Sequence, residues 1–308
     1  MKQVRIGTRN SQLALWQAEF VRAAIIEAHP DCRVELVEIL SEGDRTLDIP
    51  LYNAGGKGLF LKELETALLD GSIDLAVHSM KDVTVSLPEG LAIPVVCERE
   101  DPRDALVSNH YSRLEELPQG ARVGTCSLRR KCQLAEARPD LELVNLRGNV
   151  NTRLAKLDAG EYDAIILAAA GLIRLDMQER IAEALEPSLC LPAVGQGIVG
   201  IECRKDDIAM QDIIAPLNHS QSQVMVRAER EVNRILEGGC HAPLACFSEI
   251  RGQELRLRGL VGTVDGARVL RSDHIGTVDS PEALGEKVAR ELIEIGALEI
   301  IALRQHDG

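Results

Sequence analysis

Hydrophobic and polar positions follow a repeating order along most of the chain. Short apolar runs rich in Val, Ile and Leu are typical of strands. They cover residues 3–8, 34–40, 72–79, 121–125, 141–146, 162–171 and 198–204. Between them, apolar residues recur at helical spacing over residues 12–28, 59–70, 127–137 and 149–160. This alternation predicts two α/β lobes with largely parallel sheets, in which Ser11 caps the first helix.

The C-terminal part has a different order of elements. We expect a helix over 222–236, strands over 254–264 and 268–276, and a last helix over 281–296. That order predicts a small α+β domain. The connectors 98–104 and 191–197 are charged or rich in Pro and Gly, and indicate that the chain enters a second lobe and later returns to the first. Two lobes joined by two crossings predict a cleft.

Composition narrows the class of protein. The chain has 308 residues, a net charge of −13 and only 2% aromatic residues, which argues against general nucleic-acid binding. No apolar run reaches the length of a membrane span, and the N-terminus lacks a signal-peptide core. The eight cysteines form no CxxC pair, so disulfides are not expected. We predict a soluble cytoplasmic protein whose anionic ligands, if any, bind a local basic cluster.

Cations follow strand after strand at the point where each predicted strand ends. They are Arg9, Lys81, Arg129, Arg130, Arg147, Arg153 and Arg174. Ligands of open α/β sheets bind beyond the carboxyl ends of the strands, so these residues predict a site for several anionic groups. The alternative is solvated surface charge. That alternative is weaker for Arg129 and Arg130, because the first turn of a helix disfavours a cation by about 0.3–1 kcal/mol.

Asp82 is the one acid among these bases. It could form a salt bridge that holds Lys81 or an arginine in place. It could instead stabilise a cationic reacting group, bind N–H donors or transfer a proton. The residues alone leave these roles open.

The letters of Gly195–Gly200 fit the dinucleotide motif G-x-G-x-x-G. That motif must follow a strand and open a helix. Here it follows a Pro-bearing connector and runs into a strand, so we reject it.

The stretch EGGCHAPL (237–244) places Cys240 in an irregular loop. Cys240 could bind a metal with His241, act as a nucleophile beside it, form a disulfide, or be an inert buried thiol. Adjacent residues rarely share one metal ion or form a catalytic dyad, which argues against the first two roles. The predicted compartment argues against the third, and the loop's glycines and proline count against the fourth.

Six motifs occur in an order that resembles the porphobilinogen deaminase family. They are HSMKDV (78–83), GTCSLRR (124–130), LRGNVNTRL (146–154), AAAGLIRL (168–175), LPAVGQG (191–197) and EGGCHAP (237–243). The resemblance runs from about residue 4 to about residue 300, and such an ordered set is highly specific. Thr84, Cys126 and SEGD (41–44) depart from the family's usual residues, which puts loop details in doubt more than activity.

The resemblance implies a fold of two periplasmic-binding-protein-like α/β lobes and a small C-terminal α+β domain. Domain 1 would take residues 1–97 and 198–215, domain 2 residues 103–191, and domain 3 residues 220–308. It also implies a dipyrromethane cofactor bound covalently through a thioether to Cys240. The implied reaction condenses four porphobilinogen molecules head to tail on this primer, with loss of ammonia, and releases hydroxymethylbilane by hydrolysis.

The resemblance further implies roles for individual residues. Asp82 would be catalytic, and a lid over 42–58 with Lys57 and Phe60 would cover the site. Cofactor and substrate carboxylates would be held by Arg9, Ser11, Lys81, Thr125, Ser127, Arg129, Arg130, Arg147, Gly148, Arg153, Arg174 and Gln196. The expected partner is porphobilinogen, with no metal, and the expected state is a monomer. Two other classes compete with this transferase: a two-lobed binding protein for a small polyanion, and a hydrolase that uses Cys240.

Overall fold

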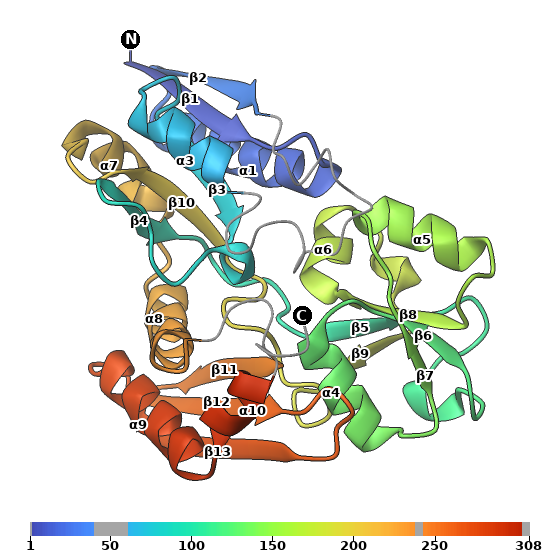
Figure 1. Ribbon diagram of the computed structural model, residues 1–308. Coiled ribbons are helices and arrows are strands. Elements are labelled where there is room, and N and C mark those ends of the chain that lie inside the picture. The colour runs from blue at the N-terminus through green and yellow to red at the C-terminus, as the bar shows by residue number, and fades with distance from the viewer. Residues whose placement is uncertain (1, 40–60, 238–242, 304–308) are drawn as a thin grey trace. The chain divides into compact units, whose positions relative to one another are not determined.

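The computed structural model describes residues 2–39, 61–237 and 243–303, and its ribbon is drawn in Figure 1. The chain divides into two units by its internal contacts. Unit 1 comprises Met1–Arg99 and Ile198–Gln223, and unit 2 comprises Glu100–Gly197 and Val224–Gly308. The predicted boundaries between three domains stay predictions, since unit 2 contains two sheets.

Unit 1 is built on a sheet with the strand order β2-β1-β3-β10-β4. Its strands are β1 (Lys2–Thr8), β2 (Cys32–Glu38), β3 (Leu75–Ser79), β4 (Leu91–Val96) and β10 (Val199–Arg204). Its helical elements are α1 (Gln12–Ala28), α3 (Lys62–Leu69), η1 (Met80–Asp82), α7 (Ile208–Ile214) and η4 (Ala215–Leu217). Leu75 and Val77 of β3 pack with the buried residues of α1, while Ala76 packs with those of α3. Successive side chains of a strand point to opposite faces, so α1 and α3 cover opposite faces of the sheet.

The first sheet of unit 2 has the order β7-β6-β8-β5-β9. Its strands are β5 (Asp104–Val107), β6 (Arg122–Gly124), β7 (Glu142–Val144), β8 (Ala164–Ala168) and β9 (Glu183–Leu185). Its helical elements are η2 (Leu114–Glu116), α4 (Leu128–Ala137), α5 (Val150–Asp158), α6 (Ala169–Arg174) and η3 (Gln178–Arg180). Ile166 of β8 packs in the same cluster as Leu134 of α4, whereas Ile165 packs with α5 and α6. The sheet is therefore covered on both faces.

One strand in each of these sheets runs against the others, and it is the first strand after the chain changes unit. β5 is antiparallel to β8 and β9, and β10 is antiparallel to β3 and β4. An antiparallel strand begins at the edge where its parallel neighbours end. Asp104 at the start of β5 accordingly pairs with Ala168 at the end of β8, and Val199 at the start of β10 pairs with Ser79 at the end of β3.

The second sheet of unit 2 is antiparallel, with the order β11-β12-β13. Its strands are β11 (Leu244–Arg251), β12 (Glu254–Gly262) and β13 (Val269–Thr277), and its helices are α8 (Ser220–Ile235), α9 (Pro281–Glu294) and α10 (Ala297–Leu303). A large apolar cluster joins these three helices to the sheet. A smaller cluster that contains Cys132 of α4 and Phe247 of β11 joins this sheet to the rest of unit 2.

The predicted α/β alternation and the small C-terminal domain are confirmed, but several boundaries differ, two of them beside residues of the candidate site. The strand predicted over 162–171 ends at Ala168, and α6 begins at Ala169. The run AAAG lacks a period that separates strand from helix, and alanine favours the helix. The charged connector predicted to extend to Asp104 ends earlier, because Asp104 is the first residue of β5.

Backbone conformation and close packing explain why glycine occupies the positions of the rejected dinucleotide motif. Gly195 and Gly197 have φ values of 67° and 86°, which favour glycine. Gly200 lies on β10, where a Cβ atom would overlap the sulfur of the buried Met80 and approach Cγ2 of Ile93 at 3.2 Å. Gly195 and Gly197 therefore determine the backbone of the connector, and Gly200 leaves room for the Met80 side chain of η1.

We expect the substitution Gly200→Ala to lower the free energy of unfolding by about 1–3 kcal/mol, because the added methyl group overpacks this position. It should also disturb η1, since Met80 is the first residue of that turn. Urea unfolding followed by circular dichroism measures the change. An unfolding midpoint equal to that of the wild-type protein would show that Met80 moves aside without cost.

Candidate active site

In unit 1, four of the predicted site residues lie at one edge of the sheet. β1 and β3 are adjacent and parallel, so the segments that follow them meet at the same edge. Arg9 and Ser11 follow β1, and Lys81 and Asp82 belong to η1 after β3. The side chain of Asp82 is exposed, and Arg9, Ser11 and Lys81 are partly buried. This edge therefore brings together cations, a hydroxyl group and one carboxylate.

Three hydrogen bonds hold the segments that form this edge. The Ser11 hydroxyl accepts from the N–H of Ala14 and caps α1, as predicted. The buried Gln17 donates from Nε2 to the Ser79 hydroxyl at 2.8 Å, which ties α1 to the end of β3. The Met80 N–H donates to the Ile198 carbonyl at 2.9 Å, which ties η1 to the residue before β10. Two hydrogen bonds at adjacent residues thus hold the start of the turn that carries Asp82.

In unit 2, predicted site residues follow three adjacent parallel strands. β6 lies between β7 and β8, and the segments after these strands lead into α4, α5 and α6. Ser127 caps α4, where its hydroxyl accepts from the Arg130 N–H, and its own N–H donates to the buried Thr125 hydroxyl at 3.2 Å. A serine cap at a helix N-terminus keeps its hydroxyl hydrogen for an anion.

The segment after β7 needs glycine for its shape. Gly148 has a φ of 116°, and a Cβ atom there would lie 2.7 Å from the Thr152 side chain. The Gly148 carbonyl accepts from Nε of Arg153 at 2.7 Å, so the turn orients the Arg153 guanidinium. Arg147, one residue earlier, is partly buried at the same edge.

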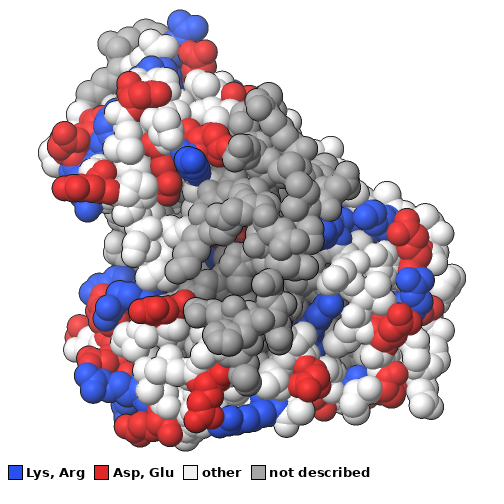
Figure 2. Space-filling model, in the orientation of Figure 1, with Lys and Arg blue, Asp and Glu red and all other residues white. Residues whose placement is uncertain are grey.

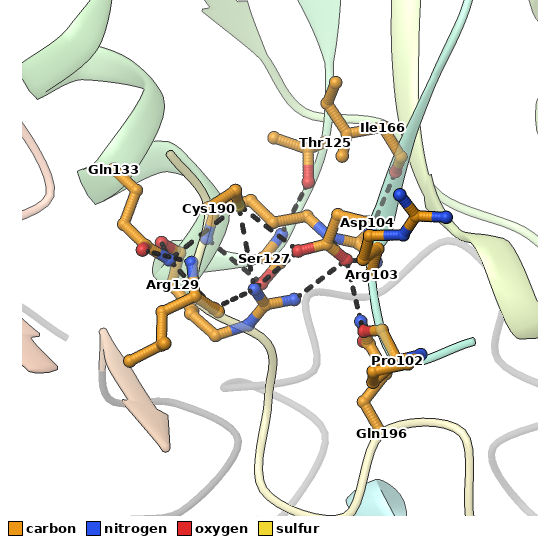
Figure 3. A network of polar contacts seen from close by, with 12 residues as sticks. Pro102, Arg103, Asp104, Thr125, Ser127, Arg129, Gln133, Ile166, Cys190 and Gln196 are labelled. Carbon is orange, nitrogen blue, oxygen red and sulfur yellow. Dashed lines mark hydrogen bonds and ion pairs between the residues drawn. The ribbon is translucent and has the colours of Figure 1, made fainter. Parts of the chain in front are cut away.

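The carboxylate of Asp104 lies at the centre of a buried network (Figure 3). Asp104 is 0% exposed, and Arg129 and Arg130 are each 5% exposed. Arg129 donates to Oδ2 from Nη1 at 2.6 Å and to Oδ1 from Nη2 at 3.1 Å. Arg130 donates to Oδ1 from Nε at 2.9 Å and from Nη2 at 2.7 Å. The two arginines share one internal counter-ion, and their predicted binding of ligand carboxylates stays a prediction.

Backbone carbonyls and further side chains complete this network. Arg129 Nη1 donates to the Leu191 carbonyl at 2.7 Å, and Arg130 Nη1 donates to the Ile166 carbonyl at 2.7 Å. The Cys190 thiol lies 3.2 Å from Oδ2 of Asp104 and donates to it. The network therefore joins α4 to β5, β8 and the connector before Gly195.

Two predicted site residues bind at the connector 191–197. Gln196 belongs to the connector, and Arg174 of α6 contacts it. Gln196 is 1% exposed and donates from Nε2 to the Pro102 carbonyl at 2.6 Å and to Oδ1 of Asp104 at 3.1 Å. Arg174 is 7% exposed and donates from Nη2 to the Gly197 carbonyl at 2.7 Å. Gln196 and Arg174 thus both donate to backbone carbonyls of the two connecting segments.

Sequence reasoning missed Asp104, Cys190 and Gln133 as members of the network. Gln133 accepts from the Leu191 N–H at 2.6 Å and donates to the Leu191 carbonyl at 3.1 Å. One signal was present: an acid directly before the apolar run Ala105–Val107, in a chain with two arginines in a helix's first turn. The predicted residues Lys57, Phe60 and Cys240 lie outside the described residues.

Asp104 has a pKa well below its ordinary value. Burial alone would raise the pKa, but the charges and hydrogen bonds of Arg129 and Arg130 outweigh burial. A lowered folded-state pKa stabilises the fold fully above the unfolded pKa of about 3.9, and this stabilisation is lost as pH falls toward the folded value.

We expect the difference in unfolding free energy between the wild-type protein and Asp104→Asn to be constant from about pH 7 to pH 5 and to shrink below about pH 4. Urea titrations at stepped pH values measure this difference. A difference that already shrinks between pH 7 and pH 5 would contradict the lowered pKa.

The described surface in Figure 2 has no large continuous patch of positive charge that could bind a polyanion. Blue Lys and Arg side chains and red Asp and Glu side chains are interspersed over the described part of that face. Among the described helices, none combines the length and apolar content needed to cross a bilayer. An anion-binding site on this acidic chain would therefore need a local cluster of cations.

The chain also has low similarity to several solved structures. The periplasmic aliphatic sulphonate binding protein SsuA from Escherichia coli has a TM-score of 0.43 and 15% identity, over 96% of this chain and 88% of that chain. The periplasmic VFT2 domain of BvgS from Bordetella pertussis has a TM-score of 0.42 and 13% identity, over 69% of this chain and 85% of that chain.

Two family models match most of the sequence. Residues 4–212 match "Porphobilinogen deaminase, dipyromethane cofactor binding domain", and residues 223–294 match "Porphobilinogen deaminase, C-terminal domain". The first match contains both sheet edges with their basic residues and Asp82, and the second contains Cys240. This chain belongs to the porphobilinogen deaminase family.

Proposed function

We propose that this protein condenses four porphobilinogen molecules head to tail, with loss of four ammonia molecules, and releases hydroxymethylbilane by hydrolysis. The family is one of transferases in tetrapyrrole synthesis. The observation that carries the proposal is the match of residues 4–212 to a dipyrromethane-binding domain, because that span holds Asp82 and all the described cations predicted to bind carboxylates. We further propose that the protein acts in the cytoplasm as a monomer.

The donors at the sheet edge of unit 2 suit a dipyrromethane group. Each of its two pyrrole rings carries an acetate and a propionate, so the group presents several carboxylates. Guanidinium forks and a serine at a helix N-terminus are the groups that bind carboxylates best. The residues that would hold it here are Thr125, Ser127, Arg129, Arg130, Arg147, Gly148, Arg153, Arg174 and Gln196. When bound, dipyrromethane supplies the nucleophilic α-carbon from which the chain grows.

Asp82 is proposed to stabilise the cation that forms when porphobilinogen loses ammonia. The departing amine leaves a methylene group conjugated with the pyrrole nitrogen, and the positive charge spreads over both. A carboxylate placed at that nitrogen accepts its N–H and lowers the energy of the cation. Arg9, Ser11 and Lys81 at the same edge of unit 1 would hold the carboxylates of the incoming pyrrole. The proton displaced from the attacked α-carbon leaves with solvent or with the amine.

Cys240 is proposed to anchor the primer through a thioether. The residue lies outside the described residues, between the end of α8 at Ile235 and the start of β11 at Leu244. Both flanks belong to unit 2, the unit that also holds Arg129, Arg130, Arg147 and Arg153. An anchor and carboxylate donors in one unit would keep the primer fixed to that unit while the chain lengthens.

The test is a stoichiometric assay with porphobilinogen. The purified protein should release four ammonia molecules for each hydroxymethylbilane formed, measured by a coupled ammonia assay and by chromatography of the oxidised porphyrin. Tight binding of porphobilinogen without release of ammonia would refute the proposal and would favour a two-lobed binding protein for a small polyanion. Glu89→Gln, an exposed acid in the segment before β4, is the matched control and should leave the ratio at four to one.

A further inference from the structure

Two arginines in the first turn of α4 place two positive charges in an electrostatically unfavourable position. Their guanidinium groups have the same sign, both side chains are buried, and the helix N-terminus carries partial positive charge. Buried charges are stable only when a counter-charge and hydrogen bonds compensate them. In the described chain, the compensating carboxylate for both is Asp104.

The contacts of Asp104 are numerous enough to fix both guanidinium groups. Oδ1 accepts from Arg129, from two nitrogens of Arg130 and from Gln196. Oδ2 accepts from Arg129 and from the Cys190 thiol. Each arginine also donates from Nη1 to a backbone carbonyl, that of Leu191 for Arg129 and that of Ile166 for Arg130. Neither guanidinium can turn without breaking several of these bonds.

The charge of this cluster is not balanced. Among the described residues of this network, two guanidinium groups and one carboxylate leave one net positive charge, because the Cys190 thiol stays neutral. Its pKa is raised by burial and by the adjacent Asp104. A buried excess charge at a sheet edge creates a site for one anion.

We propose that Asp104 is a positioning residue: it orients Arg129 and Arg130 and sets their cluster to bind a single ligand carboxylate. The inference rests on the proposed function for the identity of that carboxylate, which belongs to the pyrrole primer. Asp104 lies at the start of the antiparallel β5 and therefore reaches the edge where the parallel strands end. Its role is to prepare this subsite without touching the ligand.

The experiment compares Asp104→Asn with Leu106→Ala. Leu106 lies two residues further along β5, is fully buried, and belongs to the apolar cluster of α4, so its truncation weakens the same strand without changing charge. Both variants should lose thermal stability. Only Asp104→Asn should lose the covalently bound primer in most molecules, with a fall in kcat/KM of about 10²-fold, as expected when binding groups are displaced. Leu106→Ala should keep the primer and the wild-type kcat/KM.

A second readout does not depend on the primer. The Arg130 Nε–H donates to Asp104, so its proton should exchange slowly with solvent in nitrogen-15 NMR spectra of the wild-type protein and of Leu106→Ala. In Asp104→Asn it should exchange at least about tenfold faster, because the charged acceptor is gone. Equal protection of this proton in Asp104→Asn and the wild-type protein would overturn the positioning role, whether or not the protein carries a primer.

The two proposals fail in different ways. A wild-type protein that carries no primer and releases no ammonia would refute the proposed function, while the arginine exchange rates would still decide whether Asp104 positions the pair. Primer loading and kcat/KM that fall equally in Asp104→Asn and Leu106→Ala would reduce Asp104 to a structural residue and overturn the inference. Primer retained in Asp104→Asn at wild-type kcat/KM would overturn it as well.

Discussion

Replacing Asp82 with asparagine is expected to lower the turnover of porphobilinogen by about 10²–10³-fold, which is the usual effect of removing one charge-stabilising group. The amide keeps the size of the side chain but has no charge to balance the proposed cationic pyrrole. The fold should stay intact, because the side chain is exposed and surface substitutions usually change stability by less than about 0.5 kcal/mol. Primer loading should also remain, as Cys240 is unchanged.

Single-turnover kinetics measure the loss of turnover, and the intact mass measures primer loading. Glu89→Gln removes an exposed carboxylate from the same unit and should turn over at the wild-type rate. Near-normal turnover in Asp82→Asn would remove Asp82 from the reaction and leave it as a partner of Lys81 or of an arginine.

The double variant Arg129→Leu/Arg130→Leu is expected to lose both primer loading and stability. It leaves the carboxylate of Asp104 fully buried without its two cationic partners. Breaking a buried ion pair by removal of one side costs about 3–5 kcal/mol of unfolding free energy. Since the same residues are proposed to hold the primer's carboxylates, no adduct should form even in molecules that fold.

Arg113→Leu is the matched control for this variant. Arg113 forms an exposed ion pair with Glu115 in the same unit, and its side chain is 64% exposed. Such pairs contribute little, so its unfolding midpoint and primer loading should equal those of the wild-type protein. Full loading and normal stability in the double arginine variant would show that the Asp104 network is dispensable for both.

Local signals made part of the fold predictable. Ser11 precedes an amphipathic segment, and the structure confirms that it caps α1. The order of short apolar runs and helical segments was enough to predict two α/β lobes, because each strand and helix carries its own period. Basic residues at the ends of those runs located both sheet edges, since parallel strands end on the same side.

The rest depends on contacts between distant residues. The sequence pattern places Asp104 in a charged connector, because its partners Arg129 and Arg130 lie 25 and 26 residues away and no local pattern joins them. The local sequence shows Gly200 only as part of a rejected motif, whereas its packing partner is Met80, which follows a different strand. The strand β5 has only four residues, too few for a period to appear.

The intact mass of the denatured protein tests the central claim most directly. Freshly prepared wild-type protein should exceed the mass of its 308-residue chain by two linked pyrrole units, and Cys240→Ala should not. An unmodified mass in wild-type protein that is active with porphobilinogen would contradict the covalent primer. An adduct that persists in Cys240→Ala would contradict its attachment to Cys240.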